Sequence, residues 1–407
     1  MITDDKKLRI LHVVPSVDPA DGGPSVAVPL LGKAIASRGH EVVILTTQRA
    51  WSAEQGSRRQ SAVATTGNIE YVYVRRSTNF YKVSWELVRW LKANIRNFDV
   101  VHIHALFSFA STAAAFVAAK NKVPYIVRPL GVLNQWGLRN RRSILKRASL
   151  ALVEKRILTN AAAVHYTAAA ERVEAAKIGE WVARLPSFIV PLLVAAANGQ
   201  EQSAKGEEEF LQKYPRTRGK RIVLFLSRID RKKGIELLLE AFASVQKEIE
   251  NLVLLIAGSG DPAYESSLRS RAELLGINEL VVWTGFVSGE DKAAVLDAAE
   301  IFVLPSYSEN FGIAAAEAFA AGKACILSDQ VGLADDARRA NAAVVIRCDA
   351  KELAEAIKKL LTDPAARLAI GNAAQQFARN NLSLAAIGTQ LDAEYRAIAN
   401  RELSVIS

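Results

Sequence analysis

The chain has little sulfur and few aromatic residues, and both shortages narrow the class of protein. Its 407 residues include two cysteines, Cys325 and Cys348, and one methionine, and aromatic residues make up 7%. Two cysteines alone cannot build a disulfide framework or a structural zinc site. The sequence also lacks a helix-turn-helix pattern, an aromatic stacking platform and the ligand spacing of a zinc finger, which argues against a nucleic-acid partner.

Long apolar runs are also missing. The best candidate for a membrane span, residues 103–119, is rich in Ala, Ser and Thr and contains His104. It is shorter than the roughly 20 apolar residues that a bilayer requires. A strand followed by a buried helix explains it better. The first residues place acidic side chains before a short apolar run, without the basic leader of a signal peptide. We therefore expect a cytoplasmic protein.

Acidic residues are outnumbered by basic ones. The formal net charge is +10 and the isoelectric point is about 9.5. Such an excess favours anionic partners, which include nucleic acid, anionic lipid headgroups and phosphorylated small molecules. Composition does not choose among these three.

Short apolar runs alternate with helical patterns along the whole chain, and the alternation restarts after a polar stretch at residues 198–209. This order predicts an α/β fold of two doubly wound domains in tandem. The predicted domains cover residues 1–197 and 205–380, and a final helix covers 383–407. The predicted strands are 8–14, 41–47, 69–75, 99–105, 124–129, 162–167, 221–227, 252–257, 281–284, 301–305, 324–328 and 343–346. The predicted helices include 24–38, 83–97, 141–158, 235–248, 265–275, 289–299 and 313–320.

Ligands of doubly wound sheets bind beyond the carboxyl ends of the strands. In the second half, the run FLSRIDRKKG places Arg228 directly after a predicted strand, with Lys233 just before a predicted helix. Two cations on one short loop suit a diphosphate, because Arg engages two oxygens at once and Lys acts as a compact charge. The alternative is a solvated basic turn.

The run LPSYSENFGIAAAEAFAAGK carries the strongest pattern. A strand ends near Pro305, a loop holds Glu309 and Gly312, and a helix begins near Ile313. A helix start presents free backbone N–H groups and a positive dipole end to phosphate. Glu317, inside the helix, can accept hydrogen bonds from ribose hydroxyls, and Glu309 can reach the hydroxyls of a sugar. The alternative is a helix with ordinary acidic residues in its first turns.

The first half offers weaker signals. Gly22 and Gly23 follow the first strand, where glycine allows the backbone to approach a ligand. His102 and His104 lie two apart on a strand and therefore face one side. They suggest a metal pair, but no third ligand is evident nearby. We expect His104 to contact a sugar hydroxyl, and a core position remains an alternative for His102.

Residues 128–147 combine Arg128, Trp136 and the basic start of a predicted helix. The apolar face of this helix would hold Ile144, Leu145 and Leu152. The segment suits a surface for an anionic membrane or an acidic acceptor. A merely amphipathic, solvated helix is the alternative.

Taken together, the runs GGP, HIH, SRIDRKKG, TGFVS and SENFGIAAAEAFAAG resemble the retaining glycosyltransferases of family 4. The resemblance covers roughly residues 8–380, in the order that the family shows. It implies the GT-B architecture, in which two Rossmann-like domains face each other across an interdomain cleft. It also implies that the second domain holds most of the donor and that the final helix crosses back onto the first domain.

The resemblance further implies a role for each matching residue. It assigns the diphosphate to Arg228 and Lys233, the ribose to Glu317, and the transferred sugar to Glu309 and His104. The remaining donor contacts that it implies are Gly22 and Gly23 from the first domain, the main chain of Val287 near the base, and the backbone of Asn310, Phe311, Gly312 and Ile313 at the phosphates.

Chemically, the resemblance implies retention of the anomeric configuration without a covalent enzyme nucleophile. No Asp-x-Asp pair occurs in the chain, so we expect no metal and no cofactor besides the nucleotide-sugar donor. UDP-glucose or a related UDP-sugar is the predicted donor. A saccharide or lipid-linked oligosaccharide is the predicted acceptor, with contact to the inner face of the membrane as a further hypothesis. A nucleotide-sugar 2-epimerase of the same architecture is the alternative.

Overall fold

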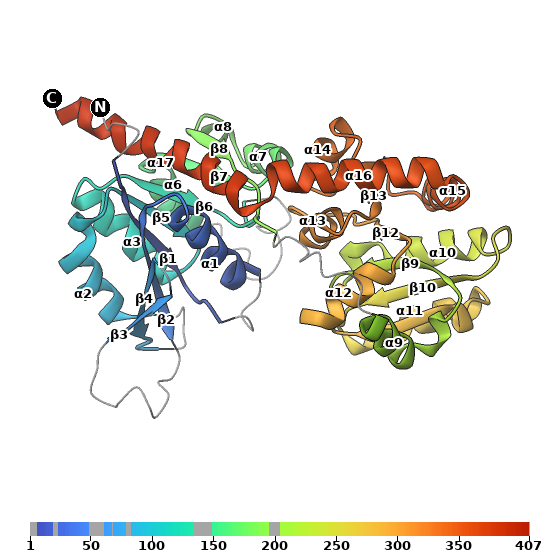
Figure 1. The fold of residues 1–407 in the computed structure, drawn as a ribbon. Helices are drawn as coiled ribbons and strands as arrows, with labels where there is room; N and C mark the ends of the chain where they lie inside the picture. The colour runs from blue at the N-terminus through green and yellow to red at the C-terminus, as the bar shows by residue number, and fades with distance from the viewer. Residues whose placement is uncertain are drawn as a thin grey trace. The chain divides into compact units, whose positions relative to one another are not determined.

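The computed structural model describes residues 6–18, 23–48, 61–66, 68–78, 83–133, 149–194 and 204–406. The chain divides into two compact units. The first unit comprises Met1–Leu193 and Leu384–Ser407, and the second comprises Val194–Ser383. Each unit is built around its own sheet, as Figure 1 shows. Among the described helices, none is both long and apolar enough to cross a bilayer.

The first unit contains an eight-stranded sheet with the order β3-β4-β2-β1-β5-β6-β7-β8. Neighbouring strands are parallel except for the antiparallel pair β3 and β4. The strands are β1 (Arg9–Val14), β2 (Glu41–Gln48), β3 (Ser61–Thr66), β4 (Ile69–Arg75), β5 (Val100–His104), β6 (Tyr125–Arg128), β7 (Ala163–Tyr166) and β8 (Ser187–Ile189).

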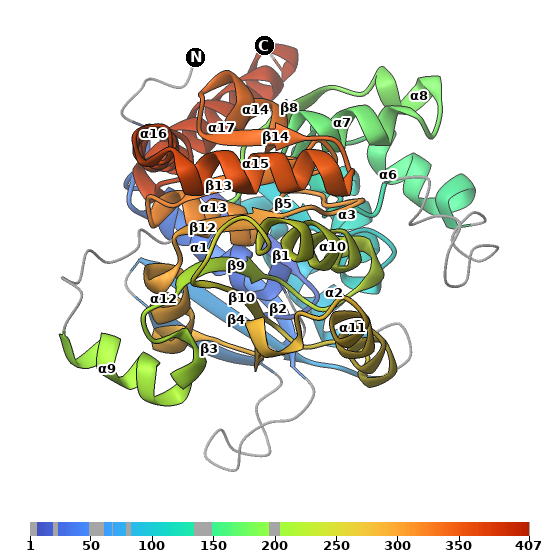
Figure 2. The same cartoon turned by 90° about the vertical axis from the view of Figure 1, so that its right-hand side faces the viewer.

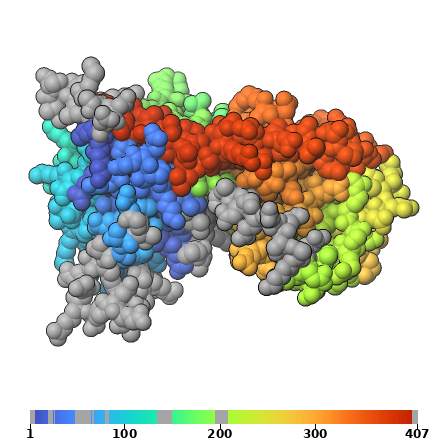
Figure 3. Space-filling view, viewed as in Figure 1, coloured from blue at the N-terminus to red at the C-terminus, as the bar shows by residue number. Residues whose placement is uncertain are grey.

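Helices cover both faces of this sheet. Successive side chains of a strand point to opposite faces. Along β1, Ile10 packs into one core with α1 and α17, whereas Leu11 packs into the other core with α2 and α3. Figure 1 shows α17 lying along α1, and the space-filling view in Figure 3 shows the outer side of α17 at the surface. The helices are α1 (Gly23–Ala36), α2 (Trp85–Asn94), α3 (Phe109–Lys120), α6 (Lys155–Thr159), α7 (Ala169–Ala176), α8 (Glu180–Ala183) and α17 (Leu384–Ile406).

The predicted helix at 141–158 is wrong in part. Residues 141–148, with Ile144 and Leu145, lie outside the described residues. The part that follows is a π-helix, Leu150–Glu154, which leads into α6. Leu152, which we placed on the apolar face of this helix, is 77% exposed. A π-helix takes more residues per turn than an α-helix, so the 3.6-residue period does not apply to this segment.

The second unit contains a fully parallel six-stranded sheet with the order β11-β10-β9-β12-β13-β14. This is the strand order 3-2-1-4-5-6 of a Rossmann fold, and its direction reverses between β9 and β12. The strands are β9 (Arg221–Leu226), β10 (Leu252–Ala257), β11 (Val281–Gly285), β12 (Ile301–Leu304), β13 (Ala324–Ser328) and β14 (Ala343–Ile346).

Several helices of the second unit begin at an aspartate. The side chains of Asp261, Asp349 and Asp363 accept hydrogen bonds from first-turn N–H groups, as N-cap residues do. Figure 2 shows α10 and α15 side by side over the sheet. The helices are α9 (Ala204–Lys213), α10 (Ile235–Val245), α11 (Pro262–Leu274), α12 (Gly289–Ala298), α13 (Ile313–Ala320), α14 (Ala334–Arg339), α15 (Ala350–Thr362) and α16 (Pro364–Asn381). The prediction of an α/β fold with two Rossmann-like, doubly wound domains is confirmed.

Gly234 lies where the loop after β9 approaches the end of β12; these are the two central strands of the second unit. It has a φ of +66°, and a Cβ atom at this position would overlap the carbonyl oxygen of Pro305, just after β12. Gly219 has the same φ, but a Cβ there would have no atom within 4 Å. A side chain at either position would therefore strain the backbone, but only at Gly234 would it also overlap neighbouring atoms.

We expect Gly219→Ala to lower the free energy of unfolding by about 1 kcal/mol, the cost of a left-handed conformation. Gly234→Ala should cost at least about 2 kcal/mol more, because the β9 and β12 loops must separate. Urea titrations followed by circular dichroism would measure both. Equal midpoints for the two variants would contradict this account of Gly234.

Candidate functional site

The carboxyl ends of β9 and β12 lie side by side at the point where the strand order of the second unit reverses. Ligands of open α/β sheets bind at this switch point. The loop after β9 carries Arg228 and Lys233, and the loop after β12 carries Glu309 and Gly312. The Tyr307 N–H donates to the Lys232 carbonyl at 2.7 Å, which ties the two loops together.

Four cations share the loop after β9, and three of them, Arg228, Lys232 and Lys233, act on one another electrostatically. Arg231–Lys233 form a 3₁₀ turn that Asp230 caps by accepting a hydrogen bond from the Lys232 N–H. Lys233 is buried and ion-paired with Glu309, whereas Arg228 is exposed. Burial lowers the pKa of Lys232, and the charges of Lys233 and Arg228 lower it further against the opposing carboxylates of Asp230 and Glu309. The three cations therefore lie in one electrostatic neighbourhood, which favours an anion.

Helix α13 begins directly beside these cations. Its N-cap, Gly312, has a φ of +98°, and a Cβ there would lie 2.8 Å from the Val331 Cγ1 atom. Among the described residues, no side chain caps this helix start. Phe311 is buried, whereas Ile313 is 41% exposed. The Gly332 N–H donates to the Glu309 carbonyl at 2.9 Å, which fixes the loop. First-turn N–H groups in such a position can receive a phosphate.

Glu317 lies on α13 and forms an ion pair of 2.6 Å with Lys292 of α12. Both side chains are partly exposed, with 23% and 35% of their surface accessible. Lys292 was not predicted as a site residue, because a lysine near the start of an ordinary helix carries no signal of its own. Val287 follows β11 and is buried, while its neighbour Phe286 is 77% exposed.

In the first unit, four of the five histidines of the chain form one buried cluster. His12 on β1 joins His104 on β5 through their Nδ1 and Nε2 atoms at 2.8 Å. His102 contacts the Tyr395 hydroxyl of α17 at 2.7 Å and the Nδ1 atom of His165 at 3.2 Å. All four histidines are fully buried. The core position that we considered for His102 is observed, and His104 is equally buried.

The expectation that no third ligand lies near His102 and His104 is wrong. Nitrogen atoms of His12, His102 and His104 lie within 4.8 Å of one another, close enough for a metal ion. His12 was not predicted, because a single histidine on an apolar strand has no pattern. Burial lowers the pKa values of all three histidines, and the charge of Arg128 lowers them further. The same positive charge disfavours a metal cation at this place.

The backbone directly after His104 is strained. Ala105 and Phe107 have φ values of +93° and +55°, a conformation that is unfavourable for residues other than glycine. The buried carboxylate of Glu154 accepts a hydrogen bond of 3.1 Å from the Phe107 N–H. Burial raises the pKa of Glu154 to about 7. Strained backbone at the end of a central strand is a common feature of functional sites.

Some predicted positions lie at the edge of what the structure describes. Gly22 is outside the described residues, as are Trp136 and the basic start of the predicted amphipathic helix. Gly23 is the first residue of α1.

The fold of the second unit is that of a doubly wound α/β domain, with a group of basic residues at its topological switch point. Residues 206–377 match the model of the family described as "Glycosyl transferases group 1". Residues 22–189 match the model of the family described as "Glycosyl transferase 4-like domain". The chain belongs to the group 1 glycosyltransferases of the GT-B type, family 4.

Individual relatives are more distant. The chain is 30% identical to alpha-D-kanosaminyltransferase of Streptomyces kanamyceticus, over 53% of this chain and 56% of that enzyme. It is 30% identical to alpha-monoglucosyldiacylglycerol synthase of Streptococcus pneumoniae, over 36% of this chain and 33% of that enzyme. The match thus spans about half or less of these curated relatives.

A solved structure of the Anabaena protein HepE in complex with UDP superposes with a TM-score of 0.72 and 15% identity. The superposition covers 96% of this chain and all of that one. At this identity the likeness concerns the fold alone.

The buried histidines make the first unit sensitive to acid. Burial lowers the pKa of His12 to about 3, from an ordinary value of 6.5. Between these two values the folded protein binds fewer protons than the unfolded chain, so the free energy of unfolding falls as the pH falls. The loss is about 1.4 kcal/mol per pH unit for each such histidine.

His12→Asn keeps a polar atom beside His104 but cannot take up a proton. We therefore expect its urea midpoint to fall less between pH 7 and pH 4.5 than the midpoint of the wild type. Urea titrations at both pH values would give the slope of the midpoint against pH for each of the two proteins. Identical slopes would show that His12 does not contribute to the acid sensitivity.

Proposed function

We propose that this glycosyltransferase transfers a hexose, with retention of configuration, from a nucleotide sugar to a saccharide or lipid-linked oligosaccharide in polysaccharide biosynthesis. UDP-glucose or a related UDP-sugar is the proposed donor. The observation that carries the proposal is the group of cations beside the uncapped start of α13, at the switch point of the second unit.

The diphosphate of the donor is the group that this site suits best. Arg228 is exposed and can engage two phosphate oxygens, whereas Lys233 is buried and shares its charge with Glu309. The N–H groups after Gly312 add donors without a charge of their own. In this arrangement Arg228 contributes most of the charge that neutralises the diphosphate, and Lys233 adds a fixed charge behind it.

The remaining roles follow the polarity of the donor. Glu317, oriented by Lys292, accepts hydrogen bonds from the ribose hydroxyls, and the main chain at Val287 lies along the base. Glu309 and His104 bind hydroxyls of the transferred sugar. Burial lowers the pKa of His104 well below its usual range, so the imidazole acts as a neutral hydrogen-bonding group at neutral pH.

Catalysis then rests on positioning and on stabilising the departing diphosphate. The bond between the anomeric carbon and the diphosphate breaks, the acceptor oxygen bonds to the same face of that carbon, and its proton passes to the leaving phosphate. This reaction needs no covalent intermediate on the enzyme, and we propose that it needs no metal.

The relatives support the substrate classes. HepE of Anabaena has been solved with UDP, and the streptococcal relative is by name a glycolipid synthase. The name of the streptococcal relative and the net charge of +10 together favour a lipid-linked acceptor and a location at the inner face of the membrane. A nucleotide-sugar 2-epimerase of the same architecture remains the second candidate.

Incubation with UDP-glucose in the absence of an acceptor separates the two candidates. We expect slow hydrolysis that releases the α anomer of glucose first. In a retaining transferase, water attacks the anomeric carbon on the face from which the diphosphate departs. ¹H NMR, recorded before mutarotation, identifies the anomer. Release of the β anomer would contradict retention, and a changed sugar on intact nucleotide would favour the epimerase.

The same assay tests His104. His104→Ala should slow the release of glucose by about tenfold or more while leaving the affinity for UDP unchanged. His40→Ala is the matched control, because His40 is equally buried in the first unit but bonds to Asp392 and to the Leu8 N–H. Equal rates in the two variants would remove His104 from the reaction.

A further inference from the structure

Arg128 is a buried cation at the carboxyl end of the strands of the first sheet. Ligands of doubly wound sheets bind beyond this end. Arg128 is the last residue of β6, and its partner in register on β5 is His104. Only 1% of its surface is exposed. Its Nε and Nη1 groups have no hydrogen-bond partner within the described part of the chain. The guanidinium is therefore withdrawn from water without a full set of protein acceptors.

No described carboxylate pairs with this charge. Glu171 is near enough to raise the pKa of Arg128, but its two oxygens accept hydrogen bonds from Gly131 and Thr167. Burial lowers the pKa of Arg128 only to about 10, so the group stays charged at neutral pH. The four histidines around it are kept neutral by burial. A buried charge in a protein is normally paired, and an unpaired one is strongly unfavourable.

Two further polar atoms in the same cluster have no hydrogen-bond partner among the residues that the structure describes. They are the Nε2 atom of His12 and the Nδ1 atom of His104, and both are buried. These two imidazoles share one hydrogen bond through their other nitrogens. Because each neutral imidazole carries one proton, one of the two unpartnered nitrogens must be an N–H donor in either tautomeric arrangement. Arg128 and this histidine pair together offer N–H groups and one positive charge.

We propose that Arg128, beside the neutral pair of His104 and His12, binds an anionic group of the acceptor, either a carboxylate or a phosphate. The inference rests on the proposed function, in which a saccharide or lipid-linked acceptor receives the sugar. It narrows the acceptor from a saccharide in general to one that carries a uronic acid or a phosphate. A metal ion bound by His12, His102 and His104 would instead place a second cation beside Arg128, which is unfavourable.

Anion binding is measurable without knowing the acceptor. The probes are inorganic phosphate and glucuronate, each compared with chloride at the same ionic strength. The parent protein carries Arg228→Ala, which weakens the binding of phosphate at the donor site by removing its exposed arginine. We expect phosphate or glucuronate to raise the melting temperature of this parent, because a ligand of the folded state stabilises it by mass action. The stronger of the two probes identifies the class of anion.

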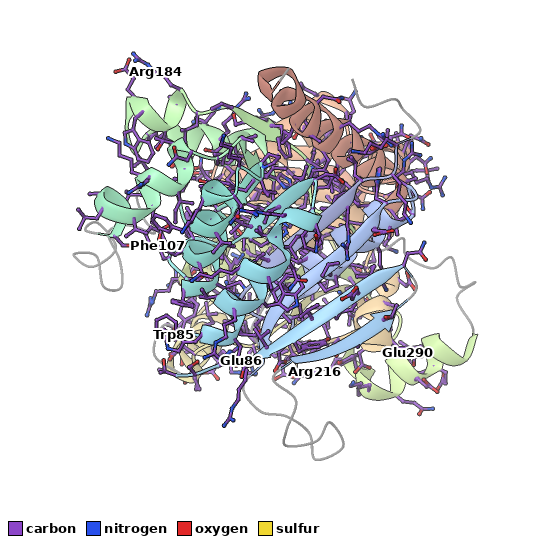
Figure 4. The ribbon with its side chains drawn as sticks, turned by 90° about the vertical axis from the view of Figure 1, so that its left-hand side faces the viewer. Trp85, Glu86, Phe107, Arg184, Arg216 and Glu290 are labelled. Carbon is purple, nitrogen blue, oxygen red and sulfur yellow. The ribbon has the colours of Figure 1, made fainter. Side chains whose placement is uncertain are left out.

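Arg128→Met in the same parent should weaken the affinity for that anion by about tenfold or more. Arg128→Lys keeps the charge and should retain part of the shift. The matched control is Arg184→Met on α8, because Arg184 has 75% of its side chain exposed and points away from the first unit in Figure 4. This control should keep the full shift.

The stability in chloride gives an independent readout. Arg128→Met removes an unpaired buried charge, so its melting temperature in chloride should equal or exceed that of the parent. A lower melting temperature, or a failure to fold, would make Arg128 a structural cation and overturn the proposal. An anion shift that persists in Arg128→Met, or no shift in the parent, would overturn it too. Because no nucleotide is present, the result does not depend on whether the donor has been identified correctly.

Discussion

The second unit depends on the contact between Gly234 and the carbonyl of Pro305. This contact lets the loop after β9 lie directly on the end of β12, which brings Lys233 to Glu309 although the two residues are 76 positions apart. Each further feature of the site follows from this approach. The ion pair fixes the loop that ends in Gly312, and Gly312 starts α13 next to the cations of the first loop. A single backbone approach thus assembles an anion site from two loops.

The two units treat charge in different ways. In the candidate site of the second unit the ionised groups are paired or exposed, as Lys233 with Glu309, Lys292 with Glu317, and Arg228 at the surface. Such groups can exchange partners when a charged ligand arrives. In the first unit burial keeps the imidazoles neutral, and Arg128 is the one cation among them. In our proposal the exchangeable ion pairs bind the charged donor, whereas the buried cluster binds sugar hydroxyls and, through Arg128, an anionic group of the acceptor.

Much of the fold could be predicted from the sequence, because buried parallel strands and amphipathic helices leave regular patterns. Arg228, Lys233, Glu309 and Gly312 could be predicted as site residues because each follows a strand of a doubly wound sheet. The pairing of Lys233 with Glu309 could not be predicted, since it depends on the order of strands in space. His12 and Arg128 were not recognised as partners of His104 for the same reason. Leu152 was misplaced because its segment follows the period of a π-helix.

The central claim is that the cations after β9 hold the diphosphate of the donor. Calorimetry with UDP and with uridine tests it directly, since the two ligands differ only in the diphosphate. In the wild type UDP should bind more tightly, and Arg228→Met should reduce the difference in binding free energy by about 1–3 kcal/mol. Arg269→Met, which removes a cation stacked on Trp283, is the control and should leave the difference unchanged. A difference that is the same in wild type and Arg228→Met would contradict the account.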